Sequence, residues 1–406
     1  MLAVLTVLTV FCGGCYDLDA LMLGTDQPAA ADAPSEAVSD DTGEPAAAAE
    51  TKDDPAPDGA YGAGETGPSA EECSTNGTRI NSAGAIRSSG TFLLEGGSYG
   101  SLSVPSGATV KPYNCQNVAV DGSVRLGDGA TLAGVTVQSD SDWVIKIGGQ
   151  DITVRNSTVK GGTIEAIRIY DNARNIKLIG NNLDGGRENH VVKVKAQSSS
   201  ANPDNILIHN NRFTKTYYGG SSEDLLQLEG HDHVVVSNNT FSDNPRGEDG
   251  FDVKQGIDGM LVEHNRFEGN NINAECLLVQ GSYAKNIVSD NMFTNCKGVS
   301  LGAHPEAKSS PWWRFDGNKL RNSMLRMRRS ENAEIVNTEM AGGTLKLGIT
   351  SQDDIPRNLK ITGNTFSGVK VENRLKYSYT CANNVMHNMA GESLKCSGTT
   401  TSDPGL

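Results

Sequence analysis

Aromatic residues are scarce in this chain of 406 residues: Phe, Trp and Tyr together make up 5%, whereas there are 46 glycines. A low content of bulky side chains argues against a large helical enzyme core and suits a repeat of short coils. Most of the chain also lacks net charge, because residues 16–72 hold fifteen acids and one Lys and so account for the whole formal charge of −14. The remainder has no basic excess, and we therefore expect no nucleic-acid partner.

A long hydrophobic run is missing at the N-terminus. The apolar stretch over residues 2–11 (LAVLTVLTVF) is too short to span a bilayer and is typical of a signal peptide. It continues into Cys12-Gly13-Gly14-Cys15, which resembles a bacterial lipoprotein signal. This resemblance implies a signal over residues 1–15, a lipid anchor at Cys15 and export, with an ordinary secretory signal as the alternative. Tyr16 stands where an Asp would retain a lipoprotein in the inner membrane, which favours the outer membrane.

Residues 16–72 are rich in Ala, Asp, Glu, Pro and Gly, and almost no large apolar residue follows Leu23. Such a segment cannot bury enough surface to offset its chain entropy. We therefore predict a disordered acidic linker over 16–72, followed by a folded domain over 73–400 that we expect to be monomeric.

Six cysteines lie beyond the signal, an even number that predicts disulfides in an exported chain. Proximity in sequence favours the pairs Cys73–Cys115, Cys276–Cys296 and Cys381–Cys396, but the spacing alone leaves the connectivity open.

A repeat with a period in the twenties runs down the chain from Asn156 to Asn384. In most coils an Asn is followed two residues later by an apolar residue, as in Asn181/Leu183, Asn211/Phe213 and Asn239/Phe241; we start this series at Asn156, and Asn337 fits it more loosely. Such a period predicts a β-solenoid in which stacking supplies the core, and stacked Asn amides can form a hydrogen-bonded ladder. We predict an all-β, right-handed parallel β-helix of about ten coils, with a short capping helix over residues 79–88.

Each coil contains a short apolar-X-apolar-X strand, whose X residues point outward and stack in columns. The first column is Arg168, Lys193, Gln227, Asp252, Leu278, Ser300, Arg326, Lys346, Lys370. The second is Tyr170, Lys195, Glu229, Lys254, Gln280, Gly302, Arg328, and the third, two residues before each strand, is Glu165, His190, Asp224, Asp249, Glu275, Lys297. Acids therefore gather at the centre of one face, with bases on both sides.

Stacked carboxylates about one strand spacing apart repel one another, and a hard cation is the usual remedy. Oxygen ligands of this kind select Ca²⁺. The alternative is a solvated charged face in which Lys residues balance the acids.

The pattern of a helix followed by Gly90-Thr91-Phe92-Leu93-Leu94 and then Gly96-Gly97 resembles the opening of pectin-lyase-like β-helices. The run Glu248-Asp249-Gly250-Phe251-Asp252, with an acid one coil earlier, resembles the calcium cluster of family 9 pectate lyases. This resemblance implies a calcium site at Asp224, Glu248, Asp249 and Asp252. The catalytic Lys position of that family is occupied here by Leu278. Lys254 instead resembles a family 6 lyase Lys, whose partner Arg is replaced here by Gln280.

A lyase of this kind removes a proton next to a uronate carboxylate, and the glycosidic oxygen then leaves. The resemblance implies Lys254 as the base, with its pKa lowered by Lys195 and a cation, and Arg326 and Arg328 as the other catalytic groups. The remaining residues that we expect to bind the acidic polysaccharide are Arg168, Lys193, Lys195, Gln280, His304, Trp312 and Trp313. We expect His190 and His304 to form hydrogen bonds rather than bind metal.

Two other functions stay open. Asp249-Gly250-Phe251-Asp252 followed by Glu275 partly resembles family 28 polygalacturonases, which implies an inverting hydrolase with Asp249 and Glu275 as the acids. However, Ala274 and Lys297 replace an acid and a His of that family. The third reading is a β-helix that binds glycans or builds a surface structure without catalysis.

Overall fold

The computed structural model describes residues 72–170, 172–195, 203–216, 223–254, 257–280, 285–302, 312–348, 356–375 and 377–401. The predicted signal and the linker up to residue 71 lie outside these residues, as does His304. Within the described part, no helix is long and apolar enough to cross a membrane.

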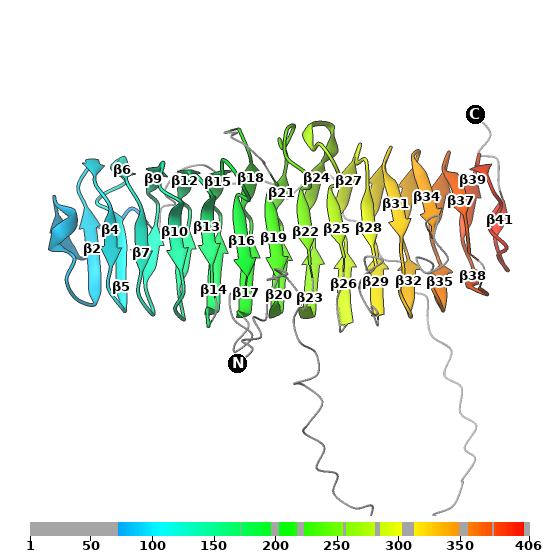
Figure 1. The fold of residues 1–406 in the computed structure, drawn as a ribbon, viewed down its shortest axis with the longest axis horizontal. Helices are drawn as coiled ribbons and strands as arrows, with labels where there is room; N and C mark the ends of the chain where they lie inside the picture. Colours follow the sequence, from blue (N-terminus) through cyan, green and yellow to red (C-terminus); the bar gives the residue numbers. More distant parts are fainter. Residues whose placement is uncertain are drawn as a thin grey trace, which may run out of the picture. The chain divides into compact units, whose positions relative to one another are not determined.

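These residues form a right-handed parallel β-helix, as predicted, with three sheets along its sides (Figure 1). The first sheet consists of β1 (Thr78–Ile80), β2 (Gly90–Leu94), β5 (Ala108–Pro112), β8 (Thr131–Ala133), β11 (Thr153–Arg155), β14 (Arg174–Ile179), β17 (Asp204–His209), β20 (His231–Ser237), β23 (Ile257–Glu263), β26 (Lys285–Ser289), β29 (Trp312–Asp316), β32 (Ala333–Val336), β35 (Leu359–Thr362) and β38 (Thr380–Ala382).

The second sheet carries the predicted functional face. It consists of β4 (Leu102–Val104), β7 (Val124–Leu126), β10 (Trp143–Ile147), β13 (Glu165–Ile169), β16 (Val192–Lys195), β19 (Leu226–Glu229), β22 (Phe251–Val253), β25 (Leu277–Val279), β28 (Val299–Leu301), β31 (Met324–Met327), β34 (Thr344–Leu347), β37 (Lys370–Asn373) and β40 (Ala390–Gly391).

The third sheet consists of β3 (Gly97–Tyr99), β6 (Val118–Asp121), β9 (Thr136–Ser139), β12 (Thr158–Gly161), β15 (Asn182–Gly185), β18 (Arg212–Thr214), β21 (Thr240–Phe241), β24 (Arg266–Glu268), β27 (Met292–Thr294), β30 (Lys319–Arg321), β33 (Glu339–Ala341), β36 (Thr365–Ser367), β39 (Val385–His387) and β41 (Thr400–Thr401). The chain visits the first, third and second sheets in turn, so strands that are neighbours in a sheet come from successive coils.

An Asn ladder lies inside the turn that leads into the third sheet. The Asn239 amide donates to the Ile208 carbonyl at 2.8 Å and to Asn265 Oδ1 at 3.0 Å, and Asn239 Oδ1 accepts the Asn211 backbone N–H at 2.8 Å. Each buried amide thereby satisfies the backbone of neighbouring coils, which a purely apolar side chain could not do.

The ladder corrects two positions of the predicted repeat. In the coils of Asn156 and Asn337, the ladder position is occupied by Ser157 and Thr338. The backbone N–H groups of Ser157 and Thr338 donate to the Asn of the next coil. Asn156 and Asn337 instead occupy the preceding position, where φ is 47° and 50°. Successive coils place residues that tolerate this left-handed conformation at that position, among them Gly180, Asn210 and Asp290.

Phenylalanines stack in the core next to the ladder. The ring centroids of Phe213, Phe241, Phe267 and Phe293 are 4.7 Å apart from one coil to the next, with interplanar angles of 12°, 5° and 12°. In these four coils one ring per coil therefore forms a continuous column in the core.

The N-terminal end differs from the prediction. Residues 79–88 do not form a capping α-helix, because β1 takes up Arg79 and Ile80 and only a 3-10 turn follows at Ala83–Ala85. Glu72, assigned to the linker, is fully buried, and its Oε1 accepts a hydrogen bond from Asn156 Nδ2 at 2.7 Å. The three disulfides favoured by proximity in sequence are present: Cys73–Cys115, Cys276–Cys296 and Cys381–Cys396.

Candidate functional site

The strand register confirms the predicted columns over most of the second sheet. Arg168 pairs with Lys193, Lys193 with Gln227, and Gln227 with Asp252. The predicted register is wrong only at the last coil of the columns. Lys346 pairs there with Glu372, whereas the prediction paired it with Lys370. A shift of two residues keeps the same face outward, so the apolar pattern by itself could not distinguish the two registers.

The column of acids is held by the backbone. The Asp224 N–H donates to His190 Nδ1 at 3.2 Å, the Asp249 N–H to Asp224 Oδ1 at 3.0 Å, and the Glu275 N–H to Asp249 Oδ1 at 2.7 Å. Asp224 and Asp249 therefore each have one carboxylate oxygen bound by a backbone N–H of the next coil.

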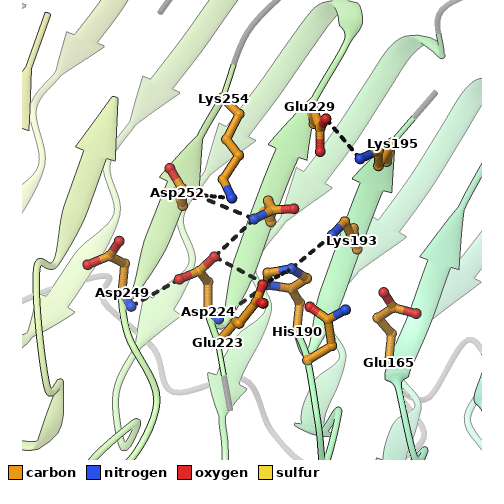
Figure 2. A network of polar contacts seen from close by, with 12 residues as sticks. Glu165, His190, Lys193, Lys195, Glu223, Asp224, Glu229, Asp249, Asp252 and Lys254 are labelled. Atoms are coloured by element: carbon orange, nitrogen blue, oxygen red, sulfur yellow. Dashed lines mark hydrogen bonds and ion pairs between the residues drawn. The ribbon is translucent and has the colours of Figure 1, made fainter. Parts of the chain in front are cut away.

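Three carboxyl groups converge next to β19 and β22 (Figure 2). One oxygen each from Asp224, Asp249 and Asp252 lies within 4.8 Å of the other two, and none of the three residues is more than 5% exposed. Lys254 Nζ lies 3.5 Å from Asp252 Oδ2, and Gln280 Nε2 donates to Asp252 Oδ1 at 3.2 Å. One Lys thus stands beside three buried acids.

Burial and mutual repulsion shift the acidity of this cluster. Burial first, and then the charge of Asp224, raise the pKa of Asp249 to about 8 and the pKa of Asp252 to about 7. The pKa of Lys254 is also raised: burial is the largest single cause and lowers it, but Asp252, Asp224 and Glu223 together outweigh burial. Without a cation the Lys254 pKa is therefore raised, and the lowering expected beside a bound cation stays a prediction.

His190 joins the acids to the basic side of the face. It is fully buried, its Nε2 lies 2.8 Å from Glu223 Oε2, and Lys193 Nζ lies 3.1 Å from the same nitrogen. The hydrogen bond with His190 lowers the pKa of Glu223 to about 2. Lys193, in contrast, has its pKa lowered by burial and by Arg168.

The donor set fits a hard divalent cation. Asp224, Asp249 and Asp252 offer buried oxygens to such an ion, and Gln227 Nε2 donates to Asp224 Oδ2 at 3.2 Å. Glu248, the fourth predicted ligand, is exposed and lies outside the group of converging oxygens. Burial, followed by Asp224 and Glu223, raises the pKa of the Glu248 carboxyl. A second group that could hold an ion joins His190, Glu223 and Asp224.

The predicted basic residues are tied to acids on both sides of the cluster. Arg168 contacts Glu165 at 2.9 Å, and Lys195 contacts Glu229 at 2.9 Å. Arg326 reaches back to Glu275, with which it forms a close ion pair, and donates to Ser300 Oγ at 3.1 Å. Because the Glu275 N–H binds Asp249, Arg326 is linked to the acid cluster through one residue.

Arg328 lies in the second column on the same coil, where its backbone N–H donates to the Leu301 carbonyl at 2.7 Å. The described contacts do not connect it to the acid cluster, so its catalytic role stays a prediction.

Of the predicted tryptophans, Trp313 is wholly buried on β29 of the first sheet, so its assignment as a sugar-stacking residue is wrong. Period-2 alternation places its ring inside, next to the phenylalanine column, because Phe315 follows two residues later. The Trp312 side chain and His304 lie outside what the structure describes.

Lys215 is a charged residue that sequence reasoning missed. It is fully buried, its Nζ contacts the Asn189 carbonyl oxygen closely, and burial lowers its pKa to about 8. A Lys directly after a short strand is expected to be solvent-exposed, because the local sequence pattern does not show its contact with Asn189 of another coil.

Comparison with known proteins supports the same class of fold. The family model described as "Right handed beta helix region" matches residues 189–311. Together with the sheet topology, this match fits the pectin-lyase-like β-helix superfamily. No curated protein sequence matches the chain significantly.

Several solved structures have a similar fold at low sequence identity. A PL6 family alginate lyase, AlyGC, is 13% identical with a TM-score of 0.51, over 79% of this chain and 53% of that one. The surface protein and adhesin PfbA of Streptococcus pneumoniae is 13% identical with a TM-score of 0.44, over 76% and 91%. The catalytic domain of a GH87 alpha-1,3-glucanase is 10% identical with a TM-score of 0.45, over 76% and 61%. These likenesses concern the fold.

Proposed function

We propose that this protein cleaves an acidic, uronate-containing polysaccharide by β-elimination on the second-sheet face, with a calcium ion at the acid cluster. The observation that carries the proposal is the convergence of Asp224, Asp249 and Asp252, whose oxygens lie within 4.8 Å of one another. Burying three acids beside one Lys is costly unless protons or a cation balance them. The lyase reading also agrees with the alginate lyase among the proteins of similar fold.

Asp224, Asp249 and Asp252 would hold the ion. A bound calcium ion would draw electron density from a substrate carboxylate and so acidify the neighbouring C–H bond. In the reaction a base takes that proton, the C–H electron pair forms a C=C bond, and the glycosidic C–O bond breaks. The departing oxygen then takes up a proton.

Lys254 is the base in this proposal, because its partly exposed ammonium group lies 3.5 Å from the acid cluster. A base must be neutral before it can accept a proton. Negative carboxylates raise the Lys254 pKa, and a bound cation would balance their charge. Burial, which lowers the Lys254 pKa, would then be the main remaining effect. Lys193, whose pKa is already lowered by burial and by Arg168, is the alternative base.

A hydrolase is the second candidate, and one observation favours it. With a pKa raised to about 8, Asp249 keeps its proton at neutral pH, as a general acid must. Glu275, whose N–H binds Asp249, would be the paired carboxylate. In this reading the cluster needs no cation.

The proposed assay uses the chain from residue 16 onward with pectate, alginate and glycosaminoglycans, in calcium or in chelator. An unsaturated, ultraviolet-absorbing product that requires calcium supports the lyase. New reducing ends without that absorbance, insensitive to chelator, would replace it with the hydrolase. Binding without either product would leave a non-catalytic glycan-binding protein.

Single substitutions of Lys254 and Lys193 test which of the two residues is the base. We expect Lys254→Ala to abolish turnover and Lys193→Ala to weaken substrate binding, whereas full activity of Lys254→Ala would remove Lys254 from the mechanism. Lys370→Ala is the matched control, because Lys370 lies on the same sheet, is 58% exposed and pairs only locally with Glu372 at 2.8 Å.

We also propose that the protein is exported and held on the cell envelope by lipid at Cys15. The three disulfides support an oxidising compartment. Metabolic labelling with a radioactive fatty acid should mark the wild type and not Cys15→Ser; equal labelling of both would exclude this anchor.

A further inference from the structure

The first column of the site continues toward the N-terminus beyond the residues that sequence reasoning assigned. Arg125 on β7 pairs in register with Lys146 on β10, Lys146 with Arg168, and Arg168 with Lys193. Four successive coils thus present one cation each, spaced by about 4.8 Å per strand. Beyond Lys193 the same column reaches Gln227 and then Asp252 of the acid cluster.

The two outer cations are available for a ligand. Arg125 and Lys146 are exposed, and neither forms an ion pair with a carboxylate among the residues that the structure describes. Arg168, one coil closer to the cluster, is 8% exposed and is held by Glu165 at 2.9 Å.

Two aromatic rings lie beside these cations. The rings of Trp143 and Tyr170 meet edge to face with centroids 6.0 Å apart, and Lys146 Nζ lies 4.8 Å and 4.4 Å from the two centroids. Glu165 holds the Trp143 ring in place, because its Oε2 accepts a hydrogen bond from the Trp143 Nε1–H at 2.6 Å. The Tyr170 hydroxyl is buried and finds no hydrogen-bond partner among the described residues, which is unusual for a buried polar atom.

We propose that Trp143, Lys146 and Tyr170 form a further binding subsite for an anionic sugar unit, at the outer end of a cationic track that leads to the acid cluster. This inference rests on the proposed function only in that the ligand is the same acidic polysaccharide.

The chemistry of each group fits such a ligand. The cation–π contacts hold the Lys146 ammonium at the surface, where it can bind a sugar carboxylate, and the half-buried Trp143 offers a ring edge and face to the apolar side of a pyranose. A polyuronate carries one carboxylate per unit and meets one cation per coil, whereas a neutral glucan gains nothing from the cations.

The test measures affinity by isothermal titration calorimetry and follows tryptophan fluorescence in parallel, separately from cleavage. The protein carries Asp252→Asn and is kept in chelator to prevent turnover, and the probes are hexasaccharides of galacturonate, of alginate and, as a neutral control, of maltose units. We expect a saturable fluorescence change with an acidic probe that is lost in Trp143→Phe and weakens with added salt. Lys146→Ala should weaken binding about five- to tenfold, while Lys370→Ala should not.

In the protein with Asp252 intact, Lys146→Ala should raise KM and leave kcat near its original value, because the subsite lies away from the reacting bond. Unchanged affinity in both Trp143→Phe and Lys146→Ala overturns the subsite, even if the polymer is cleaved. Loss of affinity in both, without any cleavage by the wild type, overturns the lyase and keeps the binding site. If Trp143→Phe fails to fold, Lys146→Gln at its exposed position serves as the second variant.

Discussion

Replacing Asp249 by Asn tests whether the negative charge of the acid cluster lowers the stability of the folded protein. The change keeps an oxygen that can accept the Glu275 N–H, now at 2.7 Å from Asp249 Oδ1, and removes one charge. Folding raises the pKa of Asp249 from 3.8 to about 8, so the folded chain binds more protons than the unfolded chain between these values. Stability without a cation must therefore fall as the pH rises through this window.

The size of the effect follows from the shift. Each pH unit inside the window costs about 1.4 kcal/mol, so the cost of Asp249 at pH 7 has a ceiling of about 4 kcal/mol. In chelator, Asp249→Asn should be as stable as the wild type near about pH 4 and more stable by on the order of 2–4 kcal/mol at pH 7. In saturating calcium the order should reverse, because only the wild type keeps all three carboxylates.

Urea unfolding followed by circular dichroism, at several pH values with calcium or chelator, measures both effects. Glu339→Gln, at an exposed position on β33, should change stability by less than about 0.5 kcal/mol under every condition. A difference between Asp249→Asn and the wild type that does not change with pH would refute the argument from buried ionisation. A wild type that calcium does not stabilise would refute the cation.

Three further predictions concern the fold that carries the site. Asn265→Ala should destabilise the protein by about 2–4 kcal/mol in urea unfolding, because it leaves the buried Val236 carbonyl and Asn239 N–H without partners, whereas Thr365→Ala on the exposed face should be neutral. Phe241→Ala should cost about 3–5 kcal/mol by opening a gap in the ring column, and an equal loss in exposed Tyr377→Ala would contradict this. Cys276→Ser with Cys296→Ser should lower the free energy of unfolding by about 2–4 kcal/mol, and an unchanged unfolding midpoint would show that the disulfide beside Glu275 is dispensable.

The repeat made most of the fold predictable. Period-2 alternation and a spacing in the twenties are local properties of the chain, and they were sufficient to find the strands from Ile167 to Leu347 in their correct register. The predictions failed where the pattern is ambiguous. Lys370 was placed two residues out of register, and the ladder was started at Asn156 because Ser157 and Asn156 can both follow a turn.

The site was predictable to the same extent. Since stacked strands place equivalent residues in columns, Asp224, Asp249 and Asp252 could be brought together without coordinates. The length and direction of side chains are not contained in such a register, and Glu248 therefore turned out to be exposed while Lys215 is buried. The Trp143–Tyr170 pair was missed because the predicted columns begin at the coil of Arg168 and Tyr170, so the preceding coil with Trp143 was not aligned.

The amino-acid sequence by itself determined the parallel β-helix, the disulfide candidates and the face on which the charges gather, because each depends on spacing along the chain. The tertiary structure alone decided how far the acids are buried, and hence that the pKa of Asp249 is raised and that of Lys254 is raised too. It also decided which cations stay exposed beyond the cluster. The physical reason is that desolvation and Coulomb interactions depend on distances across several coils, which no local pattern contains.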